Sequence, residues 1–214
     1  MAKQETGRTI IRKGGLKYTP KENKDRFFFP EEYIKFQQNL KRKNKHSAIV
    51  QINTGARIKE LQNVKVEDCY LQDRRIVLKV TKRKAKKKEA RGRERIIPIS
   101  SEFSKYLKKF FDKNKLKPSD YILISKTCTF NIAIKRAAKK AGIEGYNDFS
   151  SHNLRKTLEV WLMSLDVQTL SLLAHFGHDI KTAAVNYVSP DIFSWEDRQK
   201  MRKIIGDLYD RRRG

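Results

Sequence analysis

Two pairs of residues in the sequence each place an arginine next to a second functional side chain. Arg57 lies three residues before Glu60, and His152 lies three residues before Arg155. Residues three apart share one face of a helix, so the two members of each pair would act on the same ligand. Guanidinium groups bind phosphate oxygens with two parallel hydrogen bonds, which makes phosphate the first ligand to consider. Taken alone, each pair also fits an ordinary helix surface, as an ion pair or as a histidine in a capping region.

A third set of candidates lies in the stretch LLAHFGHDIKTAAVNYVSP, residues 172–190, which contains His175, His178 and Tyr187. The apolar positions of this stretch do not keep a helical period to its end, and Ser189-Pro190 stops it. The sequence therefore predicts a short helical segment that breaks, with two histidines and a tyrosine close together in the chain.

The sequence lacks the motifs of other hydrolytic and phosphate-binding sites. A two-metal nuclease clusters carboxylates around Mg²⁺, whereas the acidic residues here are scattered. The GxxxxGK[ST] phosphate-binding loop and the GxSxG motif are both absent. His175 and His178 have the spacing of zinc ligands, but no neighbouring Cys/His pair completes four ligands. What remains is cleavage without a metal or a cofactor, by a nucleophile, cations and a general acid.

The charge of the chain predicts a polyanionic partner. Its 214 residues include 49 Lys and Arg against 24 Asp and Glu, a formal net charge of +25. Such an excess opposes compaction through self-repulsion, so a nucleic acid is the first candidate and an anionic membrane the second. Lysine enrichment in a heat-adapted protein would bring matching glutamate, and here basic residues outnumber acidic ones two to one.

The sequence also predicts a soluble, intracellular protein with no membrane partner. Cys69 and Cys128 are isolated and lack CxxC spacing, which fits a reducing compartment and gives no metal signature. No apolar run approaches the ~20 residues that span a bilayer. The N-terminal residues lack the apolar core of a signal peptide. We therefore expect a cytoplasmic protein.

The chain begins with a polar segment and then turns into a packed body. Residues 1–26 are rich in basic residues and are expected to form an arm or linker. The motif FFFPEEYIKF opens the body at residue 27, where Pro30 and the two glutamates after it suit the first turn of a helix. A second helix is predicted over residues 47–62, with an interruption near Thr54-Gly55.

A small antiparallel sheet is predicted after these helices. Apolar residues alternate at Val64 and Val66, again over residues 76–80, and form a short run over residues 96–99. The turn between the last two strands, TKRKAKKKEARGRER at residues 81–95, has nine basic residues and two acidic ones. Such a turn is expected to be solvated or to touch phosphates, and the alternative is a charged loop without a function.

Helices dominate the rest of the chain. Amphipathic patterns predict helices over five segments: residues 102–114, 129–141, a helix capped by Ser150-Ser151, 167–176 and 194–210. Gly142 and Gly177 stand where two of these helices should end. The order of helices, a three-stranded sheet and more helices predicts a mainly helical α+β fold.

Three motifs in this order resemble the tyrosine recombinases, the family of phage-type integrases. TGARIKELQNVKVEDC (54–69) resembles their first arginine box, usually TGxRxxEL followed by a strand ending in Asp. SSHNLRKT (150–157) resembles their HxxR box, and FGHDIKTAAVNY (176–187) resembles their LGH…Y box, with Phe176 in place of the usual leucine. FFFPEEYIKF is similar to the opening of their catalytic domain. The resemblance covers residues 27–190.

The resemblance implies a role for each residue that matches a motif. Arg57 and Arg155 would clamp the scissile phosphate, His152 and His178 would hydrogen-bond it or shuttle protons, and Glu60 would support the site. Tyr187 would attack phosphorus, leaving a 3′-phosphotyrosyl bond and a free 5′-hydroxyl. A lysine of the basic turn would protonate the leaving oxygen, with Lys82 the first choice and Lys84 the second. The basic turn would also bind DNA, and its expected DNA-binding residues are Lys84, Lys86, Lys87, Lys88, Arg91 and Arg93.

The chain departs from the family pattern at its N-terminal end. The family usually carries a helical core-binding domain before the catalytic domain, and here only residues 1–26 precede the body. Either the chain is a catalytic fragment of a longer protein or the enzyme is minimal. We expect an arm at residues 1–26, a catalytic domain at residues 27–190 and a C-terminal helix within residues 191–214. That helix could pack on its own body or on a neighbouring subunit.

The function expected from the resemblance is site-specific recombination or integration of double-stranded DNA, independent of metal and ATP. Self-association into a dimer or tetramer on DNA is expected, as is a nucleoid-associated location for a protein of a kind that viruses and plasmids encode. Three alternatives stay open: a strand transferase like type IB topoisomerases or telomere resolvases, a non-catalytic DNA-binding member of the family, and an RNA-binding module. The RNA-binding alternative explains the charge but leaves the three motifs unexplained.

Overall fold

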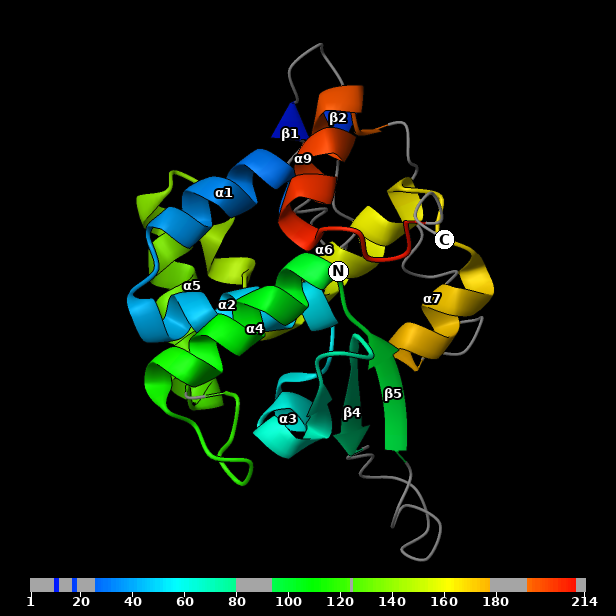
Figure 1. Cartoon of the computed structure of the whole chain (residues 1–214). Coiled ribbons are helices and arrows are strands. Elements are labelled where there is room, and N and C mark those ends of the chain that lie inside the picture. Colours follow the sequence, from blue (N-terminus) through cyan, green and yellow to red (C-terminus); the bar gives the residue numbers. More distant parts are fainter. Residues whose placement is uncertain are drawn as a thin grey trace, which may run out of the picture.

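The protein has a helical layer of several packed helices and a small sheet at one end (Figure 1). The computed structural model describes residues 10–11, 17–18, 26–79, 94–123, 125–177 and 192–210. Within residues 1–26, β1 (Ile10–Ile11) pairs antiparallel with β2 (Lys17–Tyr18). Arg26, directly before the phenylalanines that open the packed body, is already buried at 3% exposure.

Two helices follow the phenylalanines at residues 27–29. Helix α1 (Pro30–Gln38) has Pro30 in its first turn, and a carboxylate oxygen of Glu32 accepts from the backbone nitrogen of Phe29 at 2.9 Å. Helix α2 (Arg42–Thr54) begins five residues before the predicted start. It ends at Gly55, whose φ of 55° is the left-handed conformation that glycine adopts most easily. The predicted interruption near Thr54-Gly55 is therefore a complete break, and a separate helix α3 (Ile58–Leu61) follows.

The predicted three-stranded antiparallel sheet is present, with the strands in the order β3-β4-β5. Its strands are β3 (Cys69–Tyr70), β4 (Arg75–Lys79) and β5 (Glu94–Pro98). The predicted position of the first strand was wrong, because Val66 opens a short 3₁₀ helix, η2 (Val66–Asp68). Asp68 accepts from the backbone nitrogen of Lys65 at 2.9 Å, and this local hydrogen bond competes with strand pairing.

A small apolar core joins the sheet to helix α4 (Ser101–Asn114). Ile76, Leu78 and Ile97 are fully buried on the inner face of the sheet, and Leu107 meets them from α4. Alternation along β4 and β5 puts every second residue on this face, which is the pattern that predicted the two strands.

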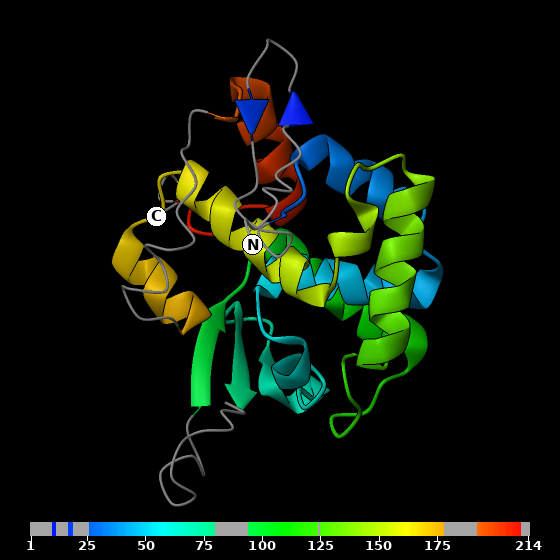
Figure 2. The same cartoon turned by 180° about the vertical axis from the view of Figure 1, so that it is seen from behind.

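The larger core surrounds helix α6 (Ser151–Ser164), which crosses the middle of the molecule in Figure 2. The side-chain oxygen of Ser150 caps α6 as predicted. Helix α2 packs along α6, and helix α5 (Thr127–Lys140) packs against α1, α2 and α6. The short helix η3 (Tyr146–Asp148) leads from α5 towards α6. The apolar stripe of this helix, Leu154, Leu158, Trp161 and Leu162, lies within this core, and Leu165 packs against it.

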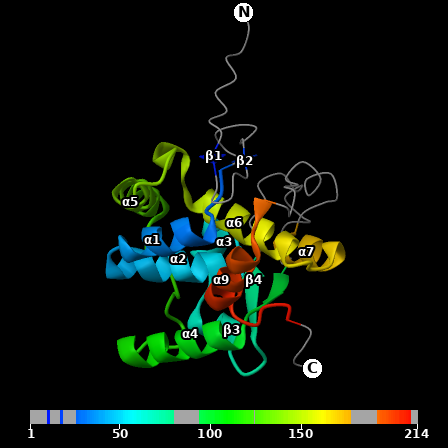
Figure 3. The same cartoon turned by 90° about the horizontal axis from the view of Figure 1, so that it is seen from above.

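Two further helices complete the described part of the chain. Helix α7 (Thr169–Phe176) ends at Gly177, as predicted. Helix α9 (Trp195–Ile205) packs against α1 and α6, with Met201 and Ile205 buried in the larger core, and Figure 3 shows it beside both helices. Among the described residues, no helix is long and apolar enough to cross a membrane. The fold is thus mainly helical α+β with a small three-stranded antiparallel sheet.

Candidate active site

Arg57 stands in the short loop between α2 and α3 and is held by one carboxylate. Glu60 accepts from the backbone nitrogen of Arg57 and from its guanidinium Nη1, and each distance is 3.0 Å. The side chain of Glu60 is 1% exposed, whereas that of Arg57 is 38% exposed. A buried glutamate therefore orients an arginine whose side chain reaches the surface.

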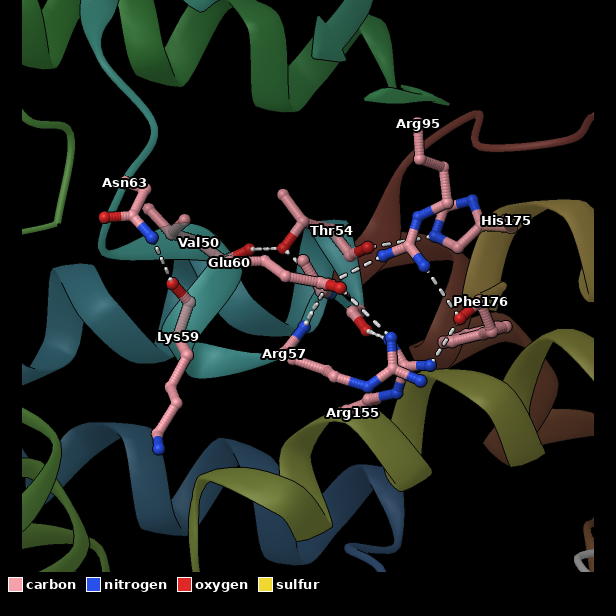
Figure 4. Close-up of polar contacts among 12 residues, drawn as sticks. Val50, Thr54, Arg57, Lys59, Glu60, Asn63, Arg95, Arg155, His175 and Phe176 are labelled. Atoms are coloured by element: carbon pink, nitrogen blue, oxygen red, sulfur yellow. Dashed lines mark hydrogen bonds and ion pairs between the residues drawn. The ribbon is translucent and has the colours of Figure 1, made fainter. Parts of the chain in front are cut away.

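Arg155 approaches the same place from α6. Its Nη1 donates to the carbonyl oxygen of Gly55 at 2.7 Å and its Nη2 donates to that of Phe176 at 2.5 Å. The residue is only 2% exposed, and the Phe176 ring lies 5.1 Å from its guanidinium carbon. Figure 4 shows Arg57 and Arg155 close together, with Arg155 between the end of α2 and the end of α7.

A third arginine, Arg95 on β5, completes the cluster. Its Nη2 donates to Glu60 at 2.8 Å and its Nη1 donates to the carbonyl oxygen of Phe176 at 2.9 Å (Figure 4). Arg95 was predicted to belong to the turn at residues 81–95, expected to be solvated or to touch phosphates, and this was wrong because it lies on β5 with its side chain only 11% exposed. The signal that could have found it is strand alternation: Arg95 is two residues before buried Ile97, on the inner face of β5.

The electrostatics of the cluster favour an anionic ligand. Burial, together with the charges of Arg57 and Arg95, lowers the pKa of Arg155 to about 9, against the opposing charges of Glu60 and Glu159. Burial also lowers the pKa of Arg95, and the Arg57 charge adds to that effect against the opposing charge of Glu60. Glu60 pairs with Arg57 and Arg95, and its charge also acts on Arg155. A phosphate beside them would relieve like-charge repulsion at a site that is already partly desolvated.

His175 supports this arrangement from the buried side. Its Nε2 lies 3.0 Å from the carbonyl oxygen of Thr54, and its Nδ1 lies 3.0 Å from the hydroxyl of Tyr209. A carbonyl only accepts, so Nε2 carries the hydrogen and Nδ1 accepts from Tyr209. Burial lowers the pKa of His175 to about 3, which keeps the ring neutral. His175 therefore ties α7 to the end of α2 and to the C-terminal segment.

The ends of α2 and α7 meet so closely that a side chain at Gly55 would not fit. A Cβ atom there would lie 2.5 Å from Cε1 of Phe176 and 2.9 Å from Cδ2 of Leu158. The φ of 55° disfavours other residues as well. This glycine lets the carbonyl that binds Arg155 sit directly against α7.

The structure brings three of the predicted site residues together: Arg57, Glu60 and Arg155. His152 lies one helical turn before Arg155 on α6, and it is exposed. The predicted catalytic residues Lys82, His178 and Tyr187 lie outside the described residues, as do Lys84, Lys86, Lys87, Lys88, Arg91 and Arg93. Over the described ranges, His, Cys, Asp and Glu side chains form no group of three that could hold a metal ion.

The mainly helical fold with a small three-stranded antiparallel sheet is the one that the resemblance to the tyrosine recombinases predicted. The sequence profile of the Phage integrase family matches residues 27–192. The chain therefore belongs to the phage integrase family, as the motifs indicated.

The relatives found by comparison are recombinases and integrases. The chain is similar to tyrosine recombinase XerA of Saccharolobus solfataricus, with 31% identity over 150 residues, 69% of this chain and 47% of the relative. It therefore spans about half the length of this curated relative. The crystal structure of XerA recombinase has a TM-score of 0.61 at 22% identity and covers 83% of this chain and 62% of its own.

Two similar folds were solved with DNA. The Tn1549 transposon integrase in complex with transposon right end DNA has a TM-score of 0.61 at 15% identity, covering 84% of this chain and 65% of its own. XerH recombinase bound to its difH substrate has a TM-score of 0.59 at 16% identity, covering 82% of this chain and 55% of its own. At these identities the structural comparisons establish a shared fold.

Proposed function

We propose that this chain cleaves and rejoins double-stranded DNA as a site-specific recombinase or integrase. The observation that carries the proposal is the cluster of Arg57, Arg95 and Arg155 around the buried carboxylate of Glu60. Its net positive charge and the 38% exposure of the Arg57 side chain suit a phosphodiester that arrives from solvent. Relatives solved in complex with DNA support the same substrate class.

The proposed reaction proceeds through a tyrosine ester. The hydroxyl oxygen of Tyr187 attacks the scissile phosphorus while the bond to the 5′-oxygen breaks, which gives a 3′-phosphotyrosine and a free 5′-hydroxyl. The tyrosine proton passes to a general base, for which His152 and His178 are the candidates. The leaving oxygen receives a proton from Lys82, or from Lys84 as the second choice.

Arg57 and Arg155 would hold the non-bridging oxygens as charge develops on the pentacoordinate phosphorus. Removing one such donor costs about 3 kcal/mol of transition-state stabilisation in other enzymes. The phosphotyrosyl bond keeps the energy of the broken phosphodiester, so the 5′-hydroxyl of a second strand can reverse the step. Neither ATP nor a metal ion is needed in this scheme.

Binding to DNA would depend on the basic segments that flank the site along the chain. The proposed contacts are the arm at residues 1–26 and the basic residues at 81–93 that precede β5, and both would meet phosphates. Each phosphate contact releases counterions, so affinity should fall steeply with salt. We further propose that the protein self-associates as a dimer or tetramer on DNA, where α9 stays on its own body or docks on a neighbour. Such an activity would place the protein at the nucleoid.

A covalent adduct with nicked DNA tests the proposal. The protein is incubated in EDTA with nicked duplexes that carry candidate target sites and trap the intermediate, and the products are run on a denaturing gel. We expect a protein–DNA adduct that is lost in Tyr187→Phe and kept in Tyr121→Phe. Tyr121 is 53% exposed and serves as the matched control.

Three results would contradict the proposal at different points. An adduct that persists in Tyr187→Phe would overturn the choice of nucleophile. Duplexes that the protein binds tightly but never cleaves would instead identify a non-catalytic DNA-binding member of the family. Relaxation of supercoiled plasmid without strand exchange would favour the topoisomerase-like alternative.

A further inference from the structure

Arg95 joins three segments that are distant in the sequence. It stands on β5, its Nη2 binds Glu60 of α3 and its Nη1 binds the carbonyl oxygen of Phe176, the last residue of α7. The two acceptors take one terminal nitrogen each, at 2.8 Å and 2.9 Å. A planar guanidinium can span two such acceptors in a fixed geometry, whereas a lysine ammonium is a single point of attachment.

Burying the charged side chain of Arg95 costs free energy. This cost indicates that the link it makes between Glu60 and Phe176 has a function. Its side chain is 11% exposed, and its Nε atom is buried without a hydrogen-bond partner among the described residues. Burial and the charge of Arg57 both lower its pKa. An apolar residue would continue the inner face of β5 at Arg95 without these costs, because Leu78, its partner on β4, is fully buried.

The glycine after α7 is matched to Arg95. Gly177 has a φ of 58°, and a Cβ atom there would lie 2.4 Å from Nη1 of Arg95. The chain at the end of α7 therefore has room for Arg95 because this residue is a glycine. In sequence, Gly177 is followed directly by His178 and then, nine residues later, by Tyr187.

Arg95 also links the two arginines proposed to clamp the phosphate. Glu60, which it binds, orients Arg57, and the Phe176 carbonyl, which it binds, also accepts from Arg155. We propose that Arg95 is a positioning residue for DNA cleavage, fixing the end of α7 and hence the start of the tyrosine-bearing segment relative to Arg57 and Arg155. This inference rests on the function proposed above.

The rival interpretation is that Arg95 contacts a DNA phosphate, as its place next to the basic turn suggests. The two interpretations differ in what a substitution changes. Loss of a phosphate contact weakens DNA affinity and lowers the slope of its salt dependence by about one. Loss of a positioning contact slows cleavage of bound DNA and leaves affinity and salt slope unchanged.

The test compares Arg95→Ala and Arg95→Lys with Arg75→Lys, a control on the neighbouring strand whose side chain is 46% exposed. Two quantities are measured: the affinity for an intact duplex over a range of salt, and the single-turnover rate of adduct formation with saturating nicked DNA. We expect both Arg95 variants to form adduct at least about tenfold more slowly with unchanged affinity and salt slope. Lysine should fail to restore the rate although it restores the charge. Full rescue by lysine, or a rate equal to wild type, would overturn the proposal.

Hydrogen exchange gives a readout that is independent of cleavage. Peptides covering residues 169–177 and 57–61 should exchange faster in Arg95→Ala and in Gly177→Ala, which displaces Arg95 without removing it. Peptides of α5 should be unchanged. Unaltered exchange at the end of α7 would show that Arg95 does not hold it, and would overturn the proposal.

The two measurements together separate this inference from the proposed function. If the wild-type protein forms no adduct on DNA that it binds, the proposed function fails. Faster hydrogen exchange in the variants would then show that Arg95 stabilises the end of α7 without a role in cleavage. If adduct forms at the wild-type rate in both Arg95 variants, the proposed function stands and the positioning role is overturned.

Discussion

Glu60 holds Arg57 at two points, because one carboxylate oxygen accepts from its backbone nitrogen and the other from its guanidinium, each at 3.0 Å. The same carboxylate accepts from Arg95 at 2.8 Å. The start of α3, the inner face of β5 and the proposed phosphate clamp thus depend on one buried side chain. A change at Glu60 should therefore affect stability as well as the site.

Glu60→Gln should destabilise the protein by about 2 to 4 kcal/mol, because the neutral amide leaves two partly buried arginines without a counter-charge. The estimate lies at the lower end for a broken buried pair because Arg57 is partly exposed. Urea unfolding measures the change. The matched control is Glu67→Gln, whose carboxylate is 49% exposed and pairs with Lys65, and which should change stability by less than about 0.5 kcal/mol. Equal effects at both positions would contradict the role assigned to Glu60.

Gly55→Ala should cost more than the same substitution at Gly142. Both glycines have positive φ values, 55° and 68°, so both alanines carry a similar backbone penalty of about 1 kcal/mol. A Cβ atom at residue 55 would collide with Phe176 and Leu158, whereas, beyond the two chain neighbours, no heavy atom of a described residue would lie within 4 Å of a Cβ atom at residue 142. We expect an additional loss of about 1 to 3 kcal/mol at Gly55, read from the difference in denaturation midpoints. A smaller loss at Gly55 than at Gly142 would argue against the tight contact between α2 and α7.

Gln51→Met should stabilise the protein. Gln51 is fully buried in α2, and neither its side-chain nitrogen nor its oxygen has a partner among the described residues. Methionine has a similar length and no polar group to desolvate, so the gain should be about 1 kcal/mol, or a few degrees in Tm. The control is Gln38→Met at the exposed end of α1, which should leave Tm nearly unchanged. A decrease in Tm for Gln51→Met would mean that the amide is satisfied by water.

His46 should make the protein less stable in mild acid. Its ring is stacked on Phe110, its Nε2 lies 2.9 Å from the carbonyl oxygen of Ile122, and burial lowers its pKa to about 4. The unfolded chain takes up this proton near the ordinary pKa of about 6.5, whereas the folded protein does not until about pH 4. The stabilisation is therefore complete above pH 6.5 and decreases by about 1.4 kcal/mol per pH unit between these values.

Unfolding free energies at pH 7 and pH 5 check this expectation in the wild type and in His46→Gln. The glutamine variant should lose less stability over this interval than the wild type. His175, with its pKa lowered to about 3, should contribute a similar decrease, and the two effects should add because the two rings have different hydrogen-bond partners. If His46→Gln and the wild type had the same pH dependence, the histidine would not be buried in its neutral form.

Much of the fold follows from local sequence patterns. Helices α1, α5 and α6 have apolar stripes with a proline, a glycine or a serine at their ends, and these features need no tertiary information. The first strand was misplaced because alternation at Val64 and Val66 reflects burial alone. Both valines contact the small core, but hydrogen bonds to the loop around residues 118–120 bend the chain into η2 instead.

The candidate site was predicted in part. Arg57, Glu60 and Arg155 were chosen from motif spacing, and the structure places them together. Arg95 was missed because its role depends on its contacts with α3 and α7, which the sequence does not give. The run of basic residues before it also made the alternation of buried and exposed residues along β5 hard to recognise. The supporting role of His175 could not be predicted either, because its partners Thr54 and Tyr209 are far away in the sequence.

The contact between His175 and Tyr209 sets a limit for anyone who produces shortened versions of this protein. Tyr209 is the residue that satisfies Nδ1 of the buried imidazole, and Leu208 beside it lies in the larger core. An expressed fragment that stops after α9 at Ile205 would therefore lose an internal hydrogen bond next to Thr54 as well as apolar packing. The boundary for a crystallisation fragment belongs beyond Asp210.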